Sequence, residues 1–440
     1  MCTKIRLWAI VAGWIISAPC LAQGDPDVAK ENAQLRRRVE TLEKQVEQLQ
    51  ATVKPPVAET APVPPPSSAA GLEPGKKPFW STLDIQFYGY LKLDAAWDSS
   101  GVNPGDYVLY TERGRQGDDE FNITARQTRL GLKIQGPATG DMKASGVVEA
   151  DFYGSAGAEN KANVLLRHAY MVFDWPDNQF SLLAGQASDV ISPLYPNTLN
   201  YTVLWDAGNI GYRHPQVRLT QQFRVGNDVT LELAGAISRT IGDAELLNPA
   251  FTPGANAGFP TLQGRAGLTF PGPGFKPTTV GVSGHWGREQ YSSDEKFDSW
   301  SLNLDVLQPI CPVVTVKGEA YVGENLDDYF GGIGQGVRTR TVSGTTLFER
   351  AIGDRGGWVA VALGPWDAWS FNVGAGLDEV ESDDVDTLGR TSNRSLFANA
   401  IYALNKSADI GVELSQWRTD FKNADDVDDV RIQTSFIYKF

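Results

Sequence analysis

The stretch VRIQTSFIYKF (430–440) decides the fold. Apolar and polar side chains alternate along it, with Ile437 as the exception, and alternate side chains of a strand share one face. The stretch is therefore a strand with one apolar and one polar face. Its apolar face finishes with Phe436, Tyr438 and Phe440. Alternation with aromatic residues at the end is typical of the closing strand of an outer-membrane β-barrel, although a strand of a soluble sandwich can share the pattern.

Sixteen segments after residue 79 show a comparable pattern, and turn residues bound them. The connections between them alternate between short turns and long polar loops, which is the plan of an outer-membrane barrel. We therefore predict an all-β fold, a closed antiparallel transmembrane barrel of sixteen strands spanning residues 79–440, whose last strand pairs with the first. The predicted strands are 83–97, 122–135, 142–153, 163–174, 179–187, 215–225, 229–239, 261–271, 278–288, 297–308, 313–323, 355–364, 367–377, 394–404, 408–419 and 430–440.

Three segments precede the predicted barrel. Residues 1–22, with Lys4 and Arg6 before an apolar run and small residues, have the pattern of a secretory signal peptide. Residues 26–54 repeat valine and leucine at heptad spacing, which predicts an α-helical coiled coil in the periplasm. Valine at a with leucine at d favours two strands, so the heptads alone do not specify a trimer. Residues 55–78 are proline-rich and predict an extended linker.

Composition excludes several classes of function. The net charge of −14 argues against nucleic acid as a partner, because nucleic-acid binders need a basic surface. The three histidines, His168, His214 and His285, are scattered and form no recognisable catalytic motif, so we predict no enzyme activity. His168 falls on the apolar side of its strand, which predicts a membrane-interface or subunit contact. We interpret the glycine-rich stretch 331–336 as a flexible loop rather than a phosphate-binding loop.

Acidic clusters at 118–120, 383–386 and 425–429 fall in predicted outer loops. Solvated loops are the simpler interpretation. The alternative is that Ca²⁺ or Mg²⁺ bridges these acids to one another or to lipopolysaccharide phosphates, although no EF-hand spacing is present. We predict no other cofactor.

Arginines give the clearest functional signal. Arg129, Arg167 and Arg218 fall on the polar, inward face of predicted strands, where positive charge would favour anions. Pairing with lumen acids such as Glu149 and Asp151 is the alternative interpretation, and the two are compatible.

The loop 188–214 ends at Arg213 and is rich in apolar residues and prolines. Exposure of so much apolar surface to water is unfavourable, so we predict that this loop folds into the barrel and narrows it. Arginines beside such a constriction would attract carboxylates, which accept paired hydrogen bonds from a guanidinium.

The order of several motifs resembles that of DcaP-type trimeric porins. The motifs are FYGYLKLD (87–94), RQTRLGLK (126–133), EADFYG (149–154), LLRHAYMVF (165–173), LLAGQ (182–186), GYRHPQVRLTQ (211–221) and YFGGIGQG (329–336). The resemblance implies a homotrimer of sixteen-stranded barrels in the bacterial outer membrane, in contact with its lipid and lipopolysaccharide. It also implies passive diffusion of small anionic solutes, often dicarboxylates, past an arginine-lined constriction.

Arg129, Arg167 and Arg218 match arginine-bearing positions of these motifs, and Arg126 and Arg213 extend the set. By resemblance to other outer-membrane proteins, the final aromatic residues serve barrel closure and recognition by the assembly machinery. A phosphate-selective porin, an outer-membrane anchor and a barrel enzyme are the alternative functions.

Overall fold

The structure, a computed structural model, describes Lys44 and residues 83–154, 162–226, 228–240, 253–291, 295–342 and 345–440. The predicted signal peptide, coiled coil and linker lie outside these residues, Lys44 excepted, and stay predictions. The chain divides into two compact units, Met1–Lys77 and Pro78–Phe440. All strands described below belong to the second unit.

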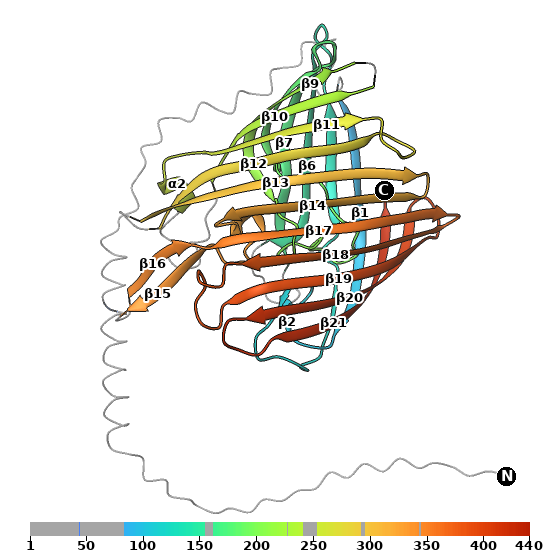
Figure 1. Cartoon of the computed structure of the whole chain (residues 1–440). Coiled ribbons are helices and arrows are strands. Elements are labelled where there is room, and N and C mark those ends of the chain that lie inside the picture. Colours follow the sequence, from blue (N-terminus) through green and yellow to red (C-terminus); the bar gives the residue numbers. More distant parts are fainter. Residues whose placement is uncertain are drawn as a thin grey trace, which may run out of the picture. The chain divides into compact units, whose positions relative to one another are not determined.

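The second unit is a closed antiparallel β-barrel, as predicted (Figure 1). Its sheet has 17 hydrogen-bonded segments, of which β4 (Glu120–Thr124) and β5 (Arg129–Gln135) pair with successive parts of β1 (Asp84–Asp98) and form one barrel strand. The described wall therefore has 16 strands. The others are β6 (Lys143–Gly154), β7 (Asn163–Trp175), β8 (Phe180–Ser188), β9 (Arg213–Arg224), β10 (Thr230–Ser238), β11 (Thr261–Phe270), β12 (Thr278–Gln290), β13 (Lys296–Cys311), β14 (Val314–Glu324), β17 (Gly353–Trp366), β18 (Trp369–Val380), β19 (Arg390–Ala403), β20 (Ala408–Phe421) and β21 (Val427–Lys439).

The last strand closes the barrel against the first. In this pairing Leu93 lies opposite Phe436. At the end of the ladder, Gly89 and Phe440 exchange two backbone hydrogen bonds, each 3.1 Å long. The Phe440 ring also stacks on Phe87, with ring centroids 5.2 Å apart. The predicted pairing of the first and last strands is confirmed.

The two faces of the wall differ in polarity, as the alternation predicts. Phe87, Leu302 and Leu414 are more than half exposed on the outer face, whereas Asp94 and Asp305, on the inner face, are 4% and 2% exposed. A soluble protein would bury the apolar set instead. Lipid can cover an apolar outer face, and a closed barrel leaves no unpaired backbone groups in the membrane.

The second barrel strand is interrupted, although we predicted an unbroken strand over 122–135. Residues 125–128 form a turn in which the Thr128 amide donates to the Ala125 carbonyl at 3.0 Å. The Thr128 hydroxyl accepts a hydrogen bond from the Lys92 amide at 3.1 Å, in place of a ladder bond. A Thr side chain can satisfy a backbone group in this way, so no strong break signal is needed in the sequence.

Two hairpins that we did not predict lie in the long loops. They are β2 (Val102–Pro104) with β3 (Val108–Thr111), and β15 (Val337–Val342) with β16 (Thr345–Ala351). Figure 1 shows the second hairpin projecting beyond the barrel wall. The described helices include one-turn elements such as α2 (Pro253–Asn256). None of the described helices is long and apolar enough to cross a membrane.

Candidate functional site in the barrel lumen

The loop between β8 and β9 folds inside the barrel, which confirms that prediction. Ile191, Leu204 and Ile210 are each 1% exposed. Side chains on the inner face of the wall hold the loop backbone: Glu319 of β14 accepts from the Leu194 amide at 2.8 Å. We call residues 189–212 the constriction loop.

The tip of the constriction loop is bound to the opposite part of the wall. Glu413 of β20 accepts from the Leu199 amide at 2.6 Å and from the Asn200 amide at 3.1 Å. The Leu199 carbonyl accepts from Lys92 Nζ at 2.7 Å and from Gln433 at 3.0 Å. These polar wall residues satisfy backbone groups that the loop would otherwise bury without partners. We did not predict this role from the sequence.

A second loop, residues 325–336, also enters the barrel. Its Tyr329 is 3% exposed, and the Tyr329 carbonyl accepts from the Gly211 amide at 2.8 Å. Phe330 stacks on Trp205 of the constriction loop, with centroids 4.4 Å apart. Our interpretation of 331–336 as an open flexible loop is therefore wrong. Gly332 and Gly334 adopt positive φ angles of 66° and 62°, which a tight buried turn requires.

Arg129 and Arg167 point into the lumen and meet two acids of β6. Arg167 is 8% exposed; its Nε donates to Glu149 at 2.9 Å and its Nη1 to Asp151 at 2.7 Å. Arg129 lies 3.5 Å from Glu149 and 3.7 Å from Asp151. The Tyr201 hydroxyl of the constriction loop accepts from Arg167 at 3.1 Å. Two cations facing two anions carry no net charge, so these arginines are compensated.

His168 lies beside this cluster, and our prediction of an outward contact is wrong. In the pairing of β6 with β7, Glu149 lies opposite His168 while Ala150 lies opposite Leu166. Arg167 is thus the extra residue of a β-bulge, which shifts the alternation by one position. His168 Nε2 consequently lies 4.0 Å from Glu149 on the inner face.

Arg213 and Arg218, both on β9, have no carboxylate partner among the described residues. Arg213 is 5% exposed, and its guanidinium carbon lies 4.1 Å from the centre of the Tyr212 ring and 5.9 Å from that of Trp205. Its Nε and Nη2 atoms are buried without a hydrogen-bond acceptor. Arg218 donates through Nε to the neutral amide of Gln216 at 3.0 Å. Positive charge is therefore uncompensated at this end of β9.

Arg126 lies in the interruption of the second strand and pairs with Asp106 at 2.8 Å. Burial raises the pKa of Asp106 above its usual range, and the Arg126 guanidinium opposes that shift. Arg126 also lies 4.7 Å over the Tyr153 ring, which packs against Tyr201 at 4.1 Å. Tyr201 thus connects Arg126 with the Arg167 cluster, so the structure brings the predicted arginines to one region beside the constriction loop.

A family model described as "DcaP outer membrane protein" matches residues 75–235. Over these residues the chain is similar to the DcaP outer membrane protein family. This segment contains β1 to β9 of the wall, the constriction loop and all five predicted arginines. No curated protein matches this chain.

Solved structures share the fold of this chain. The outer membrane channel DcaP of Acinetobacter baumannii is 19% identical, with a TM-score of 0.64, over 82% of this chain and 98% of that one. The anion-selective porin from Comamonas acidovorans is 13% identical, with a TM-score of 0.52, over 81% and 100%. The trimer form of OmpT, an outer membrane protein of Vibrio cholerae, is 12% identical, with a TM-score of 0.50, over 82% and 100%. The barrel thus has the fold of these porins.

The other two histidines of the barrel, His214 and His285, are buried. His214 Nδ1 lies 2.7 Å from Asp189, whereas His285 bonds to Ser301 at 2.7 Å. The Tyr329 ring packs against both imidazoles, at 5.0 Å and 4.1 Å. Aspartate and serine thus contact different histidines, and the described residues form no Ser-His-Asp relay.

Acids of the outer loops have arginine partners. Asp384 pairs with Arg350 at 2.8 Å and Asp386 with Arg338 at 3.0 Å. Among the residues described, no group of three or more His, Cys, Asp or Glu side chains could hold a metal ion. Cation binding at these loops stays a prediction.

Proposed function

We propose that this outer-membrane barrel is a passive diffusion channel with a modest preference for small anions, including carboxylates. Arg213 carries the proposal. Its guanidinium is buried at the constriction loop, lacks an acid partner among the described residues, and has two nitrogen atoms without a hydrogen-bond acceptor. A buried cation without a counter-ion is costly, and a passing anion would offset that cost.

The charge balance supports this direction of selectivity. Glu149 and Asp151 compensate Arg129 and Arg167, so those pairs add little net field. Arg213 and Arg218 remain as net positive charge beside the constriction loop. Protein walls of low dielectric concentrate this field in the lumen and raise the local concentration of anions. The planar guanidinium also favours carboxylates, since it can donate two parallel hydrogen bonds to them.

Planar-bilayer recording of the purified protein tests the proposal. We expect stepwise conductance, and a reversal potential in a KCl gradient that indicates chloride preference. Arg213→Gln should lower the anion-to-cation permeability ratio by roughly twofold or more, because it removes a charge that few ions screen. Arg355→Gln is the control, since Arg355 lies at an outward position and its side chain is 64% exposed. Absence of steps or a cation preference would refute the proposal.

The functional unit that we propose is a homotrimer, with the N-terminal segment in the periplasm. A relative's solved trimer form and the heptads at 26–54 support oligomerisation. Chemical crosslinking in outer-membrane vesicles, with and without residues 26–54, would give the number of chains. It would also separate the contribution of the barrel walls from that of the heptads.

A further inference from the structure

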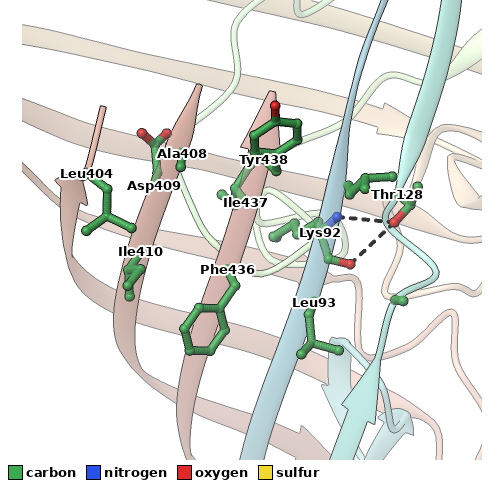
Figure 2. Close-up of a pocket in the computed structure, with 12 residues that line it drawn as sticks. Lys92, Leu93, Thr128, Leu404, Ala408, Asp409, Ile410, Phe436, Ile437 and Tyr438 are labelled. Atoms are coloured by element: carbon green, nitrogen blue, oxygen red, sulfur yellow. Dashed lines mark hydrogen bonds between the residues drawn. The ribbon is translucent and has the colours of Figure 1, made fainter. Parts of the chain in front are cut away.

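An apolar groove crosses the outer face of the wall where β20, β21, β1 and the interrupted second strand follow one another. Its volume is about 540 Å³, and its lining includes Leu93, Ile410, Phe436 and Tyr438. Figure 2 shows these side chains coming from neighbouring strands to the same region of the wall. Leu93, Phe436 and Tyr438 are 42%, 48% and 54% exposed, so the groove opens on the outer face of the wall rather than into the lumen.

The interruption of the second strand explains the groove. Outward side chains of this strand stop at Ile123 and resume at Leu130, which are both exposed. Between them only Ala125 and Thr128 line the groove, and the Thr128 hydroxyl is bound to the Lys92 backbone. The floor is therefore formed by backbone and small side chains, while leucines and aromatic rings form the sides.

The groove offers almost no polar group to a ligand. Lys92 and Asp409 belong to its lining, but the Lys92 ammonium donates to the Leu199 carbonyl inside the barrel and Asp409 pairs with Lys439 at 2.7 Å. A hydrocarbon chain is thus the chemistry that fits. Apolar burial alone would drive its binding, at a gain that grows with each methylene group covered.

A cation lies at one end of the groove. Leu404 and Ala408 line the groove, and the short turn between them carries Lys406, which is exposed and has no carboxylate partner among the described residues. Short turns of such barrels lie on the periplasmic side, where the leaflet headgroups are phosphates. Lys406 therefore lies where a phosphate headgroup would meet it.

We propose that the groove binds one acyl chain of an anionic phospholipid from the periplasmic leaflet, with the headgroup phosphate at Lys406. The outer wall of a second barrel is convex, so it would leave a gap above the groove floor at Ala125 and Thr128. Atoms that line such a gap lose packing contacts, whereas a flexible acyl chain can follow the floor and fill it.

Lipid analysis of the full-length protein tests the site. The protein is purified from outer membranes in detergent, and the phospholipid that stays bound is quantified by mass spectrometry. Leu93→Trp fills the groove and should reduce retention at least about tenfold, because several methylene contacts are lost. Leu302→Trp, at another outward leucine that is 56% exposed on β13, is the matched control and should retain the wild-type amount. Heat-modifiable gel mobility verifies that each variant is folded.

Two further measurements complete the test. The first distinguishes binding of the headgroup from binding of the acyl chain, and the second distinguishes a lipid in the groove from a second protein chain. Lys406→Glu should reduce the preference for phosphatidylglycerol over phosphatidylcholine in mixed vesicles. A photocrosslinking amino acid in place of Leu93 should label lipid. Equal lipid retention in Leu93→Trp and Leu302→Trp would overturn the proposal. So would a crosslink from position 93 to another protein chain, which would assign the groove to a second copy.

Discussion

Arg167 and Asp151 form an ion pair across neighbouring strands of the lumen, 2.7 Å from Nη1 to Oδ2, with side chains 10% and 0% exposed. Tyr201 of the constriction loop contacts both members, at 3.1 Å and 3.4 Å. The pair therefore joins β6 to β7 and fixes the loop at the same point. Its geometry indicates that Arg167 acts mainly in holding the constriction loop, whereas Arg213 has no acid partner among the described residues.

Arg167→Met should destabilise the barrel, because it leaves Glu149 and Asp151 buried without their nearest cation. Loss of one partner from a buried pair typically costs about 3–5 kcal/mol. Arg355→Met is the control, since its exposed pair with Glu379 should contribute less than about 1 kcal/mol. Urea unfolding in lipid vesicles measures both changes. Equal effects of the two substitutions would contradict the assigned role of Arg167.

Glu149→Gln should increase anion preference. Glu149 is one of two acids that face both Arg129 and Arg167, so its neutralisation leaves one more uncompensated positive charge in the lumen. The reversal potential in a KCl gradient should shift towards that of chloride. Glu379→Gln, which removes an outward-facing acid, should leave it unchanged. A shift of the same size in both variants would mean that the lumen charges do not determine selectivity.

The sequence predicted the wall because period-two alternation repeats sixteen times and each strand follows the same physical rule. Its failures are local. The interruption at 125–128 depends on Thr128 replacing a ladder bond, and the bulge at Arg167 moves His168 to the inner face. In both places the side chains after the irregularity exchange the inner and outer faces of the wall. The amino-acid composition of the strand does not change there, so the alternation of apolar and polar residues does not reveal the irregularity.

The site was predictable only in part, for a similar reason. The apolar content of the constriction loop indicated that it folds inward, and the arginines were named from their facing. Whether an acid compensates an arginine depends on distances across strands and loops, which the sequence does not contain. In the structure acids compensate Arg129 and Arg167 but not Arg213. The second inward loop was missed because glycines dominate 331–336. The adjacent Tyr329 and Phe330 were the available signal, since two aromatic residues rarely begin an exposed flexible loop.

Glu413→Ala should loosen the tip of the constriction loop. Glu413 is 1% exposed and accepts from two loop amides, and the removal of both acceptors leaves those amides unsatisfied. Each unsatisfied buried group costs about 1–3 kcal/mol. We expect increased open-channel current noise in planar bilayers as the loop moves. Glu413→Gln keeps one carbonyl acceptor and should give an intermediate result. Noise at the wild-type level in Glu413→Ala would contradict this tether.

Asp206 should make stability depend on pH. Burial raises the pKa of this constriction-loop carboxyl to about 7, with Asp354 adding to the shift and Arg390 and the Gly334 amide opposing it. The folded protein therefore binds the proton more tightly than the unfolded chain between pH ~4 and ~7, and stability falls as pH rises through that range. It should be constant above about pH 8.

Asp206→Asn tests this dependence, because the amide stays neutral and its oxygen can still accept from the Gly334 amide. The variant should match wild type near pH 4 and be more stable at pH 8, since each pKa unit corresponds to about 1.4 kcal/mol. Urea unfolding at the two pH values measures the difference. A wild-type decline in stability that persists in Asp206→Asn would assign the dependence to other groups.

Deletion of Phe440 should impair assembly more than conductance. Phe440 completes the closing ladder through two hydrogen bonds with Gly89 and stacks on Phe87, but it lies on the outer face and away from the lumen arginines. We expect a smaller folded fraction in the outer membrane, measured by heat-modifiable gel mobility, and normal single-channel conductance for the molecules that fold. Tyr402→Ala, which removes another exposed aromatic residue of the outer face, is the matched control and should fold in nearly wild-type yield. If the two variants lose the same folded fraction, the closing contact with Gly89 has no special part in assembly.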